Sequence, residues 1–219
     1  MFKGNRIFIV DKNGNKRRVF FVPGVNVKFK GKNSTVTFHE PLGKFSCCKI
    51  SCGDNAKISI GSSRYSVRKF SLLANGENTV VEIGKDFSVT SKCEVVMRPE
   101  PNLSLKIGDG CMFATNIELR PTDGHMIVDK ETGDILNYGK NIEIGNHVWV
   151  ARDVTILKGV KIADNCVIGL GAIVNKPCLE PNSIYAGVPA KLVKTGIDWD
   201  RESPMTACIS GGGNPIYEA

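Results

Sequence analysis

The sequence lacks a long apolar run. None of its stretches approaches the ~18 consecutive apolar residues that a membrane-spanning helix requires. The opening residues, MFKGNRIFIVDKNGNKRR, have too short an apolar segment and no small-residue cleavage site for a secretory signal. We therefore expect no integral membrane segment and a cytoplasmic protein. No Arg-rich helix or aromatic-basic RNA motif is present, so nucleic acid is not an expected partner.

Histidine is scarce, and the cysteines are not accompanied by a secretory signal. The chain has three histidines and eight cysteines in 219 residues. Without a secretory signal, the cysteines are expected to be reduced thiols. The close trio Cys47, Cys48 and Cys52 is compatible with a metal site or with simple packing, and the repeat described next favours packing.

The charge balance is moderately basic. Lys and Arg number 29 against 22 Asp and Glu, which gives a net charge of +7. Such an excess suits an anionic ligand, substrate or membrane surface, and a plain solubility surplus explains it equally well. The length and the even spread of glycine and apolar residues predict one domain with a sizeable core.

Apolar residues recur every six positions over most of the chain. One register has no exception: Ile144, Val150, Ile156, Ile162, Ile168 and Val174. A second is interrupted only at Pro101: Ile83, Val89, Val95, Ile107, Phe113 and Leu119. A third is weak, because it links Val36, Leu42, Ile60 and Leu72 through Cys48, Asp54 and Ser66. A period of six does not match an α-helical stripe and is typical of hexapeptide β-helices, here with roughly three hexads per coil.

The positions around each repeat leader support this interpretation. Small residues often follow the leader, as a tight bend after a short strand requires. The fifth position of the hexad holds small apolar residues, among them four cysteines, and Cys52 takes the same place in the weak register: Cys93, Cys111, Cys166 and Cys178. We therefore expect these thiols to pack in the core rather than bind zinc.

The segment from Asn146 carries a family resemblance. NHVWVARDVTILKGVKIADNCVIGLGAIVNKPCLEPNSIYAGVPAKLVK, above all HVW and AGVPAKLVK, resembles the C-terminal half of the CoA-dependent hexapeptide O-acetyltransferases. The resemblance implies an all-β fold, a left-handed parallel β-helix with an extruded catalytic loop and a short C-terminal extension. We expect the β-helix at 36–194 with its loop at 120–143, an N-terminal segment at 1–35 without such likeness, and an extension at 195–219. The extension ends in SGGGNPIYEA, which is expected to be a flexible tail.

The expected loop contains the best catalytic candidate. Continuing the second register past Leu119 reaches four polar residues where the core needs aliphatic ones: His125, Glu131, Asn137 and Glu143. TDG and TGD turn signals lie in the same stretch, so the chain is expected to leave the prism there. A loop histidine is more often solvated than catalytic, but the family carries its catalytic histidine on such a loop. The triplet DGH is similar to that of members acetylating polysaccharides and sialic acids.

The resemblance gives His125 the role of general base. An alcohol attacking a thioester must lose its proton, and an imidazole with an ordinary pKa of ~6.5 is largely free to accept it at neutral pH. Asp123 or Glu118 would orient the ring. The other histidines are expected to have no catalytic role: His147 lies at a hexad corner and should face solvent, and His39 lies in the weak repeat near Pro41. Their wide spacing also opposes the histidine zinc site of the related γ-type carbonic anhydrases, so no metal is expected.

The remaining site residues follow from the resemblance. Trp149 either covers a subunit interface or borders the acetyl and acceptor site, and we favour the latter. Acetyl-CoA would contact turns and basic residues that match the family: Ala151, Leu170, Lys176, Lys191 and Lys194. Surface lysines are common, so their assignment depends on the motif. The family trimerises so that one chain's loop meets its neighbour's cofactor groove, which implies a homotrimer.

These expectations combine into an acetyl-CoA-dependent O-acetyltransferase. Its acceptor would be a sugar hydroxyl of a surface glycan, capsular or lipopolysaccharide and sialic-acid-containing as first choice, or of its precursor. Xenobiotic O-acetylation and N-acetylation of a nucleotide-linked amino sugar are the enzymatic alternatives. A non-catalytic β-helix used for assembly or binding is the alternative from another class, and it predicts no affinity for acetyl-CoA.

Overall fold

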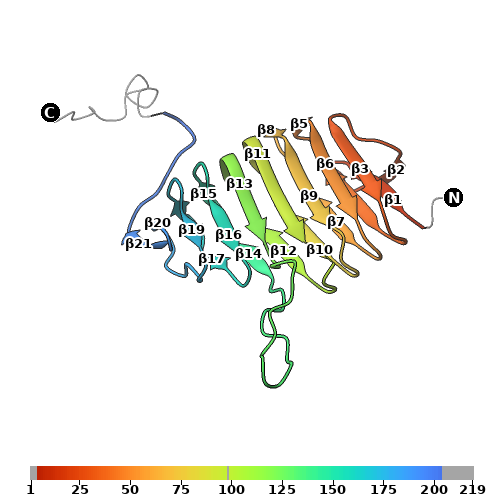
Figure 1. The fold of residues 1–219 in the computed structure, drawn as a ribbon. Coiled ribbons are helices and arrows are strands. Elements are labelled where there is room, and N and C mark those ends of the chain that lie inside the picture. The colour runs from red at the N-terminus through yellow and green to blue at the C-terminus, as the bar shows by residue number, and fades with distance from the viewer. Residues whose placement is uncertain (1–3, 98, 204–219) are drawn as a thin grey trace.

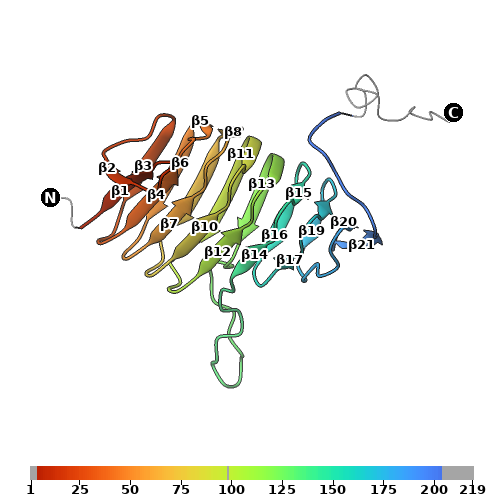
Figure 2. The same cartoon turned by 180° about the vertical axis from the view of Figure 1, so that it is seen from behind.

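The computed structural model describes residues 4–97 and 99–203, which form a long prism of stacked strands with one loop projecting from its side (Figures 1 and 2). Successive strands along the chain lie on different sides of the prism, and strands from successive coils pair in parallel. Among the described residues no helix is long and apolar enough to cross a bilayer.

The first side of the prism is an eight-stranded sheet in the order β17-β14-β12-β10-β7-β4-β1-β2. All neighbours pair in parallel except β2, which lies antiparallel to β1. Its strands are β1 (Arg6–Val10), β2 (Lys16–Val19), β4 (Thr35–His39), β7 (Lys57–Ile60), β10 (Val80–Ile83), β12 (Ser104–Ile107), β14 (Ile142–Ile144) and β17 (Lys161–Ile162).

A thirteen-stranded sheet forms the other two sides. The second side holds β5 (Lys44–Ser46), β8 (Ser66–Arg68), the first halves of β11 (Ser88–Met97) and β13 (Met112–Arg120), β15 (Trp149–Val150), β18 (Val167–Ile168) and β20 (Ile184–Ala186), with β21 (Lys191–Lys194) antiparallel to β20. The third side holds β3 (Val25–Phe29), β6 (Cys48–Cys52), β9 (Phe70–Ala74), the second halves of β11 and β13, β16 (Thr155–Leu157) and β19 (Ile173–Val174).

The corners of the prism are made by residues in the left-handed backbone region. β11 and β13 each continue around a corner, at Lys92 (φ 53°) and Asn116 (φ 59°). Asparagine tolerates this conformation better than most residues. At another corner Asn55 donates through Nδ2 to Asn78 Oδ1 (3.2 Å), and Asn78 donates in turn to Asn102 (3.1 Å). The side chains thus form a ladder that links neighbouring coils.

The coils after the loop follow the strict six-residue register. Ile144 pairs with Ile162, Val150 with Ile168 and Ile156 with Val174, and all six side chains are buried. In each pair the second residue follows the first by three hexads. The fold predicted from this register, a β-helix of stacked short parallel strands, is therefore confirmed for these coils.

The coils before the loop are wider than the sequence predicted. Val36 pairs with Ile58, Ile58 with Val81 and Val81 with Leu105. Each of these spacings exceeds three hexads, and the last reaches four. Three hexads per coil is therefore wrong for this half, because its strands on the first and third sides are four or five residues long. The weak register therefore holds only in part: Val36, Ile60 and Leu72 are buried, whereas Asp54, through which it passes, is exposed.

Residues 6–29, for which the sequence showed no repeat, belong to the same sheets. β1 pairs in parallel with β4, and β3 pairs in parallel with β6. The short strand β2 then closes the first sheet antiparallel to β1. The N-terminal segment therefore supplies a coil of the prism.

The buried cysteines pack as the repeat predicted. Six of the described thiols are buried and only Cys47 is exposed: Cys48, Cys52, Cys93, Cys111, Cys166 and Cys178. Burial raises the pKa of Cys52, Cys111 and Cys178 to about 12. Within the described residues no group of three or more His, Cys, Asp or Glu is placed to hold a metal ion.

Candidate active site

The projecting loop lies between β13 and β14, where the polar residues interrupt the register (Figure 1). Residues 121–141 leave and re-enter the prism at the corner between its third and first sides. Near the tip, the two limbs pair antiparallel at Val128 and Ile135, and Leu136 donates its backbone N–H to Ile127 O (2.8 Å). The loop is thus a small structured hairpin.

Asn137 holds the segment around His125 in place. Its Nδ2 donates to His125 O (2.8 Å) and Asp123 Oδ2 (2.9 Å), while its Oδ1 accepts the backbone N–H of Ile127 (2.7 Å). One amide on the returning limb therefore contacts the outgoing limb before, at and after the histidine. Such a set of bonds fixes the backbone from which the imidazole projects.

Lys158 attaches this arrangement to the next coil. Its Nζ forms an ion pair with Asp123 and donates to Asn137 O (2.9 Å). The hydrogen bond from Lys158, followed by that from Asn137, lowers the pKa of the Asp123 carboxyl. Asp123 therefore holds the loop, and its partners in the described chain do not include the imidazole. Glu118 pairs with Arg120 (2.8 Å), so both carboxylates proposed to orient His125 have other partners within this chain.

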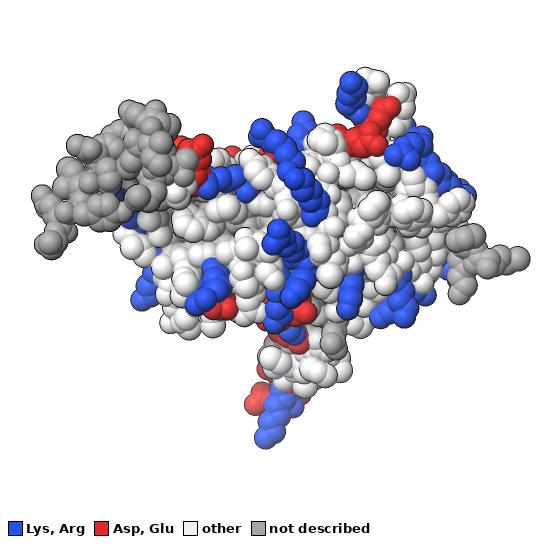
Figure 3. All heavy atoms as spheres, turned by 90° about the horizontal axis from the view of Figure 1, so that it is seen from above, with Lys and Arg blue, Asp and Glu red and all other residues white. Residues whose placement is uncertain are grey.

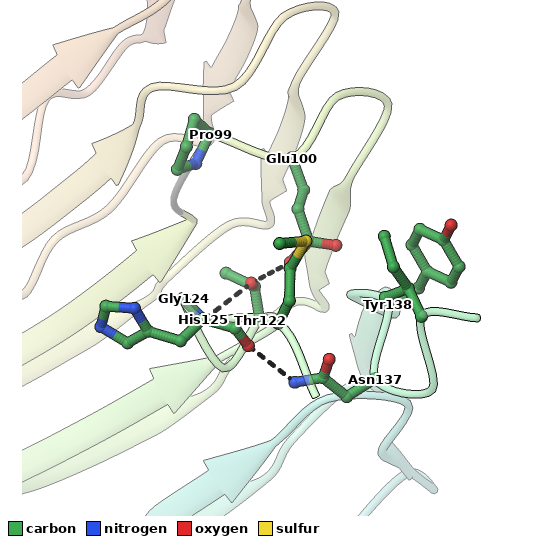
Figure 4. A pocket seen from close by; sticks show the side chains of 9 residues that line it. Pro99, Glu100, Thr122, Gly124, His125, Asn137 and Tyr138 are labelled. Carbon is green, nitrogen blue, oxygen red and sulfur yellow. Dashed lines mark hydrogen bonds between the residues drawn. The ribbon is translucent and has the colours of Figure 1, made fainter. Parts of the chain in front are cut away.

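Glu100, in the turn between β11 and β12, binds both ends of the loop. Its carboxylate accepts hydrogen bonds from the Thr122 hydroxyl and from the backbone N–H of Gly139. Between this clamp and the loop lies an apolar cavity of about 240 Å³, which Figure 4 shows from close by. Its lining includes Pro99, Glu100, Thr122, His125, Met126 and Tyr138.

The His125 side chain is exposed and points away from Asn137 (Figure 4). In the part of the chain that the structure describes, its imidazole has no hydrogen-bond partner. The neighbouring loop residues are also exposed and apolar: Met126, Ile127, Val128, Leu136 and Tyr138. The loop therefore presents an exposed imidazole among apolar side chains, and His125 also lines the cavity that Pro99 and Glu100 of the prism line.

Trp149, Ala151 and Leu170 lie elsewhere on the prism. Trp149 is half-buried on the second side, and its ring centroid is 6.0 Å from that of Trp199. Ala151 and Leu170 occupy neighbouring turns at the corner between the second and third sides, where Ala151 donates its N–H to Ile168 O (2.9 Å). One chain does not bring His125 and Trp149 together, because they lie at different edges of the prism.

The predicted basic residues also fall into two places. Lys176 is exposed at the corner of the loop, one coil beyond Lys158, as the pairing of Ile156 with Val174 requires. Lys191 and Lys194 are exposed on β21 at the end of the prism. In the segment KPCLEPN that precedes β20, Cys178 pairs in parallel with Ile162.

Sequence reasoning missed a strap formed by residues 196–202, which return from β21 along the corner between the first and second sides (Figure 2). Trp199 donates Nε1–H to His147 O (2.8 Å), and its own carbonyl lies 2.9 Å from His147 Nε2. His147 is therefore half-buried rather than solvent-facing. Trp199 is one of only two tryptophans in the chain, a signal that could have marked this segment. Residues 210–219, expected to be a flexible tail, lie outside the described residues.

Comparison with known proteins supports one family. No family model matches the chain. The polysialic acid O-acetyltransferase of Neisseria meningitidis is 34% identical over 177 residues, which are 81% of this chain and 70% of that protein. The polysialic acid O-acetyltransferase of Escherichia coli O1:K1 is 35% identical over 126 residues, 58% of this chain and 37% of the relative.

A solved structure agrees over nearly the whole chain. The polysialic acid-specific acetyltransferase NeuO superposes with a TM-score of 0.65 at 28% identity, covering 92% of this chain and 87% of that one. The agreement therefore includes the wide coils as well as the strict hexads. The chain belongs to the hexapeptide-repeat O-acetyltransferases, in the group that contains the polysialic acid O-acetyltransferases.

Proposed function

We propose that this chain transfers the acetyl group of acetyl-CoA to a hydroxyl of a sialic-acid-containing surface glycan or of its precursor. The observation that carries the proposal is the structured loop at the break in the repeat, which presents His125. The acceptor class is inferred from the similarity to a polysialic acid O-acetyltransferase over 81% of the chain.

His125 acts as the general base. The imidazole removes the proton of the sugar hydroxyl as the oxygen attacks the thioester carbonyl, and it returns that proton to the departing CoA thiolate. The oxygen–carbon bond forms, the carbon–sulfur bond breaks, and no net proton is consumed. Asn137 supports this role because it holds the carbonyl of His125 itself, and so sets the direction in which the ring projects.

The complete site needs a second copy of the chain. His125 and Trp149 lie at different edges of one prism, and the loop that carries His125 is apolar on its outside. We propose a homotrimer in which each loop reaches its neighbour's prism and places the imidazole near that neighbour's Trp149. The exposed apolar side chains of the loop would then be buried at the interface.

Acetyl-CoA would bind along the narrow coils. Ala151 and Leu170 lie in neighbouring turns beside which the pantetheine arm would run, and Leu170 is 64% exposed. Lys191 and Lys194 on β21, together with Lys176, supply positive charge for the CoA phosphates. Trp149 is proposed to border the reacting carbonyl and acceptor hydroxyl and to exclude water there. A cytoplasmic reaction is consistent with the seven free thiols of the described residues.

The test is acetyl-CoA turnover against a panel of glycans. Purified full-length chain should release free CoA thiol when acetyl-CoA and a sialic acid polymer are both present, and the polymer should gain O-acetyl groups detectable by NMR. Neutral polysaccharides matched in size serve as controls. Turnover only with a neutral sugar would overturn the acceptor assignment, and the absence of turnover and of acetyl-CoA binding would favour a non-catalytic β-helix.

A further inference from the structure

The second side of the prism carries a hollow that no part of the proposed mechanism uses. It has a volume of about 390 Å³ and lies over β8, β11 and β13. Its lining combines two arginines with hydroxyl groups and one aromatic ring: Arg68, Arg201, Ser66, Ser88, Thr90 and Tyr65. Four other surface hollows each have Asp or Glu in their lining, whereas the described residues that line this one include neither.

Arg201 is fixed in this hollow by the strap. Its Nη1 donates to Ser88 Oγ (2.7 Å), and its Nη2 donates to the carbonyls of Asp86 and Gly110 (both 3.0 Å) and of Cys111 (3.1 Å). The guanidinium also lies 4.1 Å from the centroid of the Tyr65 ring. These bonds place the cation rigidly, because their acceptors belong to two successive coils.

The charge of Arg201 is not neutralised by these bonds. All its hydrogen-bond acceptors are neutral oxygens, and within the described residues no carboxylate lies within salt-bridge distance of it. Asp86 accepts from Arg201 through its backbone carbonyl, and its carboxylate pairs with Arg64 (3.1 Å). Arg68 is exposed on β8, and no hydrogen bond or ion pair joins it to the described part of the chain. Two cations therefore face the hollow, and neither forms a salt bridge within the described residues.

The surroundings increase this positive potential. Figure 3 shows Lys and Arg side chains gathered across the middle of the upper face, over β5, β8 and β11. Lys44, Arg68, Lys69 and Lys92 are exposed on these strands and their corners. An anionic polymer approaching the prism would therefore be attracted to this side.

The hollow lies beside the proposed acceptor site. Met112 belongs to its lining and pairs directly with Trp149 across β13 and β15. Trp199, which precedes Arg201 by two positions on the strap, lies next to Trp149. If the sugar that is acetylated lies at Trp149, the next sugar of the glycan would thus lie over the hollow.

We propose that this hollow binds the carboxylate of an acidic sugar residue adjacent to the one being acetylated. Arg68 and Arg201 contact the carboxylate, Ser66 and Thr90 contact sugar hydroxyls, and Tyr65 packs against the apolar face of the ring. The inference rests on the proposed function, since it extends that acceptor site by one subsite. The strap acquires a role in acceptor specificity through Arg201.

The test compares acceptor charge with arginine removal. Arg68→Gln removes a cation that makes no bond within the described chain, so the fold should be retained. Its KM for a sialic acid oligomer should rise about tenfold with kcat and the KM for acetyl-CoA unchanged, as expected for one charge-assisted contact. The same oligomer with its carboxyl groups reduced to alcohols should show no such rise. Lys49→Gln, which removes one charge from the third side, is the control.

A second measurement compares Arg201→Lys with Arg201→Gln. Lysine keeps the positive charge but lacks the planar pair of guanidinium donors, so Arg201→Lys should raise the KM for the sialic acid oligomer less than Arg201→Gln does. An Arg68→Gln enzyme with the same oligomer KM as Lys49→Gln would overturn the subsite. Binding of the oligomer to the His125→Ala chain, measured by calorimetry, separates the two proposals. If the wild type fails to acetylate sialic acids, the proposed function fails, and Arg68-dependent binding still reports on the hollow.

Discussion

The coils before the loop and the coils after it fill their cores with different side chains. All ten phenylalanines lie at or before Phe113, and none follows the loop. Phe70, Phe87 and Phe113 pack edge to face through the wide coils, with centroids 5.9 and 5.1 Å apart. The narrow coils are filled by β-branched and smaller residues such as Val150, Ile156 and Ala172.

The difference follows from the cross-section of the prism. A coil longer than three hexads encloses more space than a coil of three, and protein interiors leave few voids larger than a water molecule. Phenylalanine fills the larger section, whereas it would overpack the smaller one. The strict hexad is therefore the signature of the narrow half only, and the loop stands at the boundary between the two halves.

The largest expected effect is at that boundary. His125→Ala should lower kcat by ~10²–10⁴, the usual share of a general base, while both halves of the prism stay folded because the loop lies outside the core. Steady-state kinetics with saturating acetyl-CoA and acceptor measure the loss. A folded variant with near-normal acetyl transfer would remove His125 from the mechanism.

Exchanging side-chain size between the halves tests the packing comparison. Phe87→Ala should lower the free energy of unfolding by ~3–5 kcal/mol, because it leaves a cavity in a wide coil. Val150→Phe should destabilise a narrow coil by ~1–3 kcal/mol through overpacking, and Ile156→Val should cost only ~0.5–1.5 kcal/mol. Denaturant unfolding measures all three. If Val150→Phe were as stable as the wild type, cross-section would not explain the distribution of phenylalanine.

The C-terminal end of the narrow half is expected to bind the phosphates of acetyl-CoA. Replacing Lys191 and Lys194 together by Ala should raise the KM for acetyl-CoA about tenfold and leave kcat unchanged, since distant phosphate contacts act equally in the ground and transition states. Lys12→Ala with Lys16→Ala at the opposite end of the prism is the control for lost charge. An unchanged KM would place the CoA phosphates elsewhere.

The smallest effect concerns a corner of the wide half. Asn78 has a φ of 55° and takes part in the asparagine ladder. Asn78→Ala should cost about 1 kcal/mol, or a few degrees in Tm, because alanine resists the left-handed region and cannot continue the ladder. Asn78→Gly restores the backbone freedom without the side chain. Equal loss in both variants would show that the ladder, and not the backbone conformation, matters.

The sequence predicted the narrow half more accurately than the wide one, for a physical reason. Where a coil is three hexads long, every sixth residue returns to the core, so periodicity alone locates Ile144 to Val174. Where the coils are longer and of unequal length, the six-residue count drifts out of phase, and Asp54 was placed inside when it lies at an exposed corner. The strands β1 and β3 escaped notice for the same reason.

The candidate site was predictable in part. The polar residues at His125 and Asn137 marked the loop because they occupy positions that the repeat reserves for aliphatic residues. The bonds made by Lys158 and Glu100 could not be predicted, since they join residues up to 39 positions apart without any period. The strap is a stronger example, because Arg201 reaches Ser88 across 113 residues.

The two antiparallel strands, β2 and β21, oppose end-to-end association of the prism with further copies. A stack of parallel strands presents unpaired backbone groups at both ends, where further copies would add and a fibre would grow. Here β2 covers one end of the first sheet and β21 covers the opposite end of the second, each reversed in direction relative to its neighbour. Both carry exposed cations, Lys16 and Arg17 on β2 and Lys191 and Lys194 on β21, which repel an identical edge. Growth along the prism axis is therefore opposed at each end by charge as well as by strand direction.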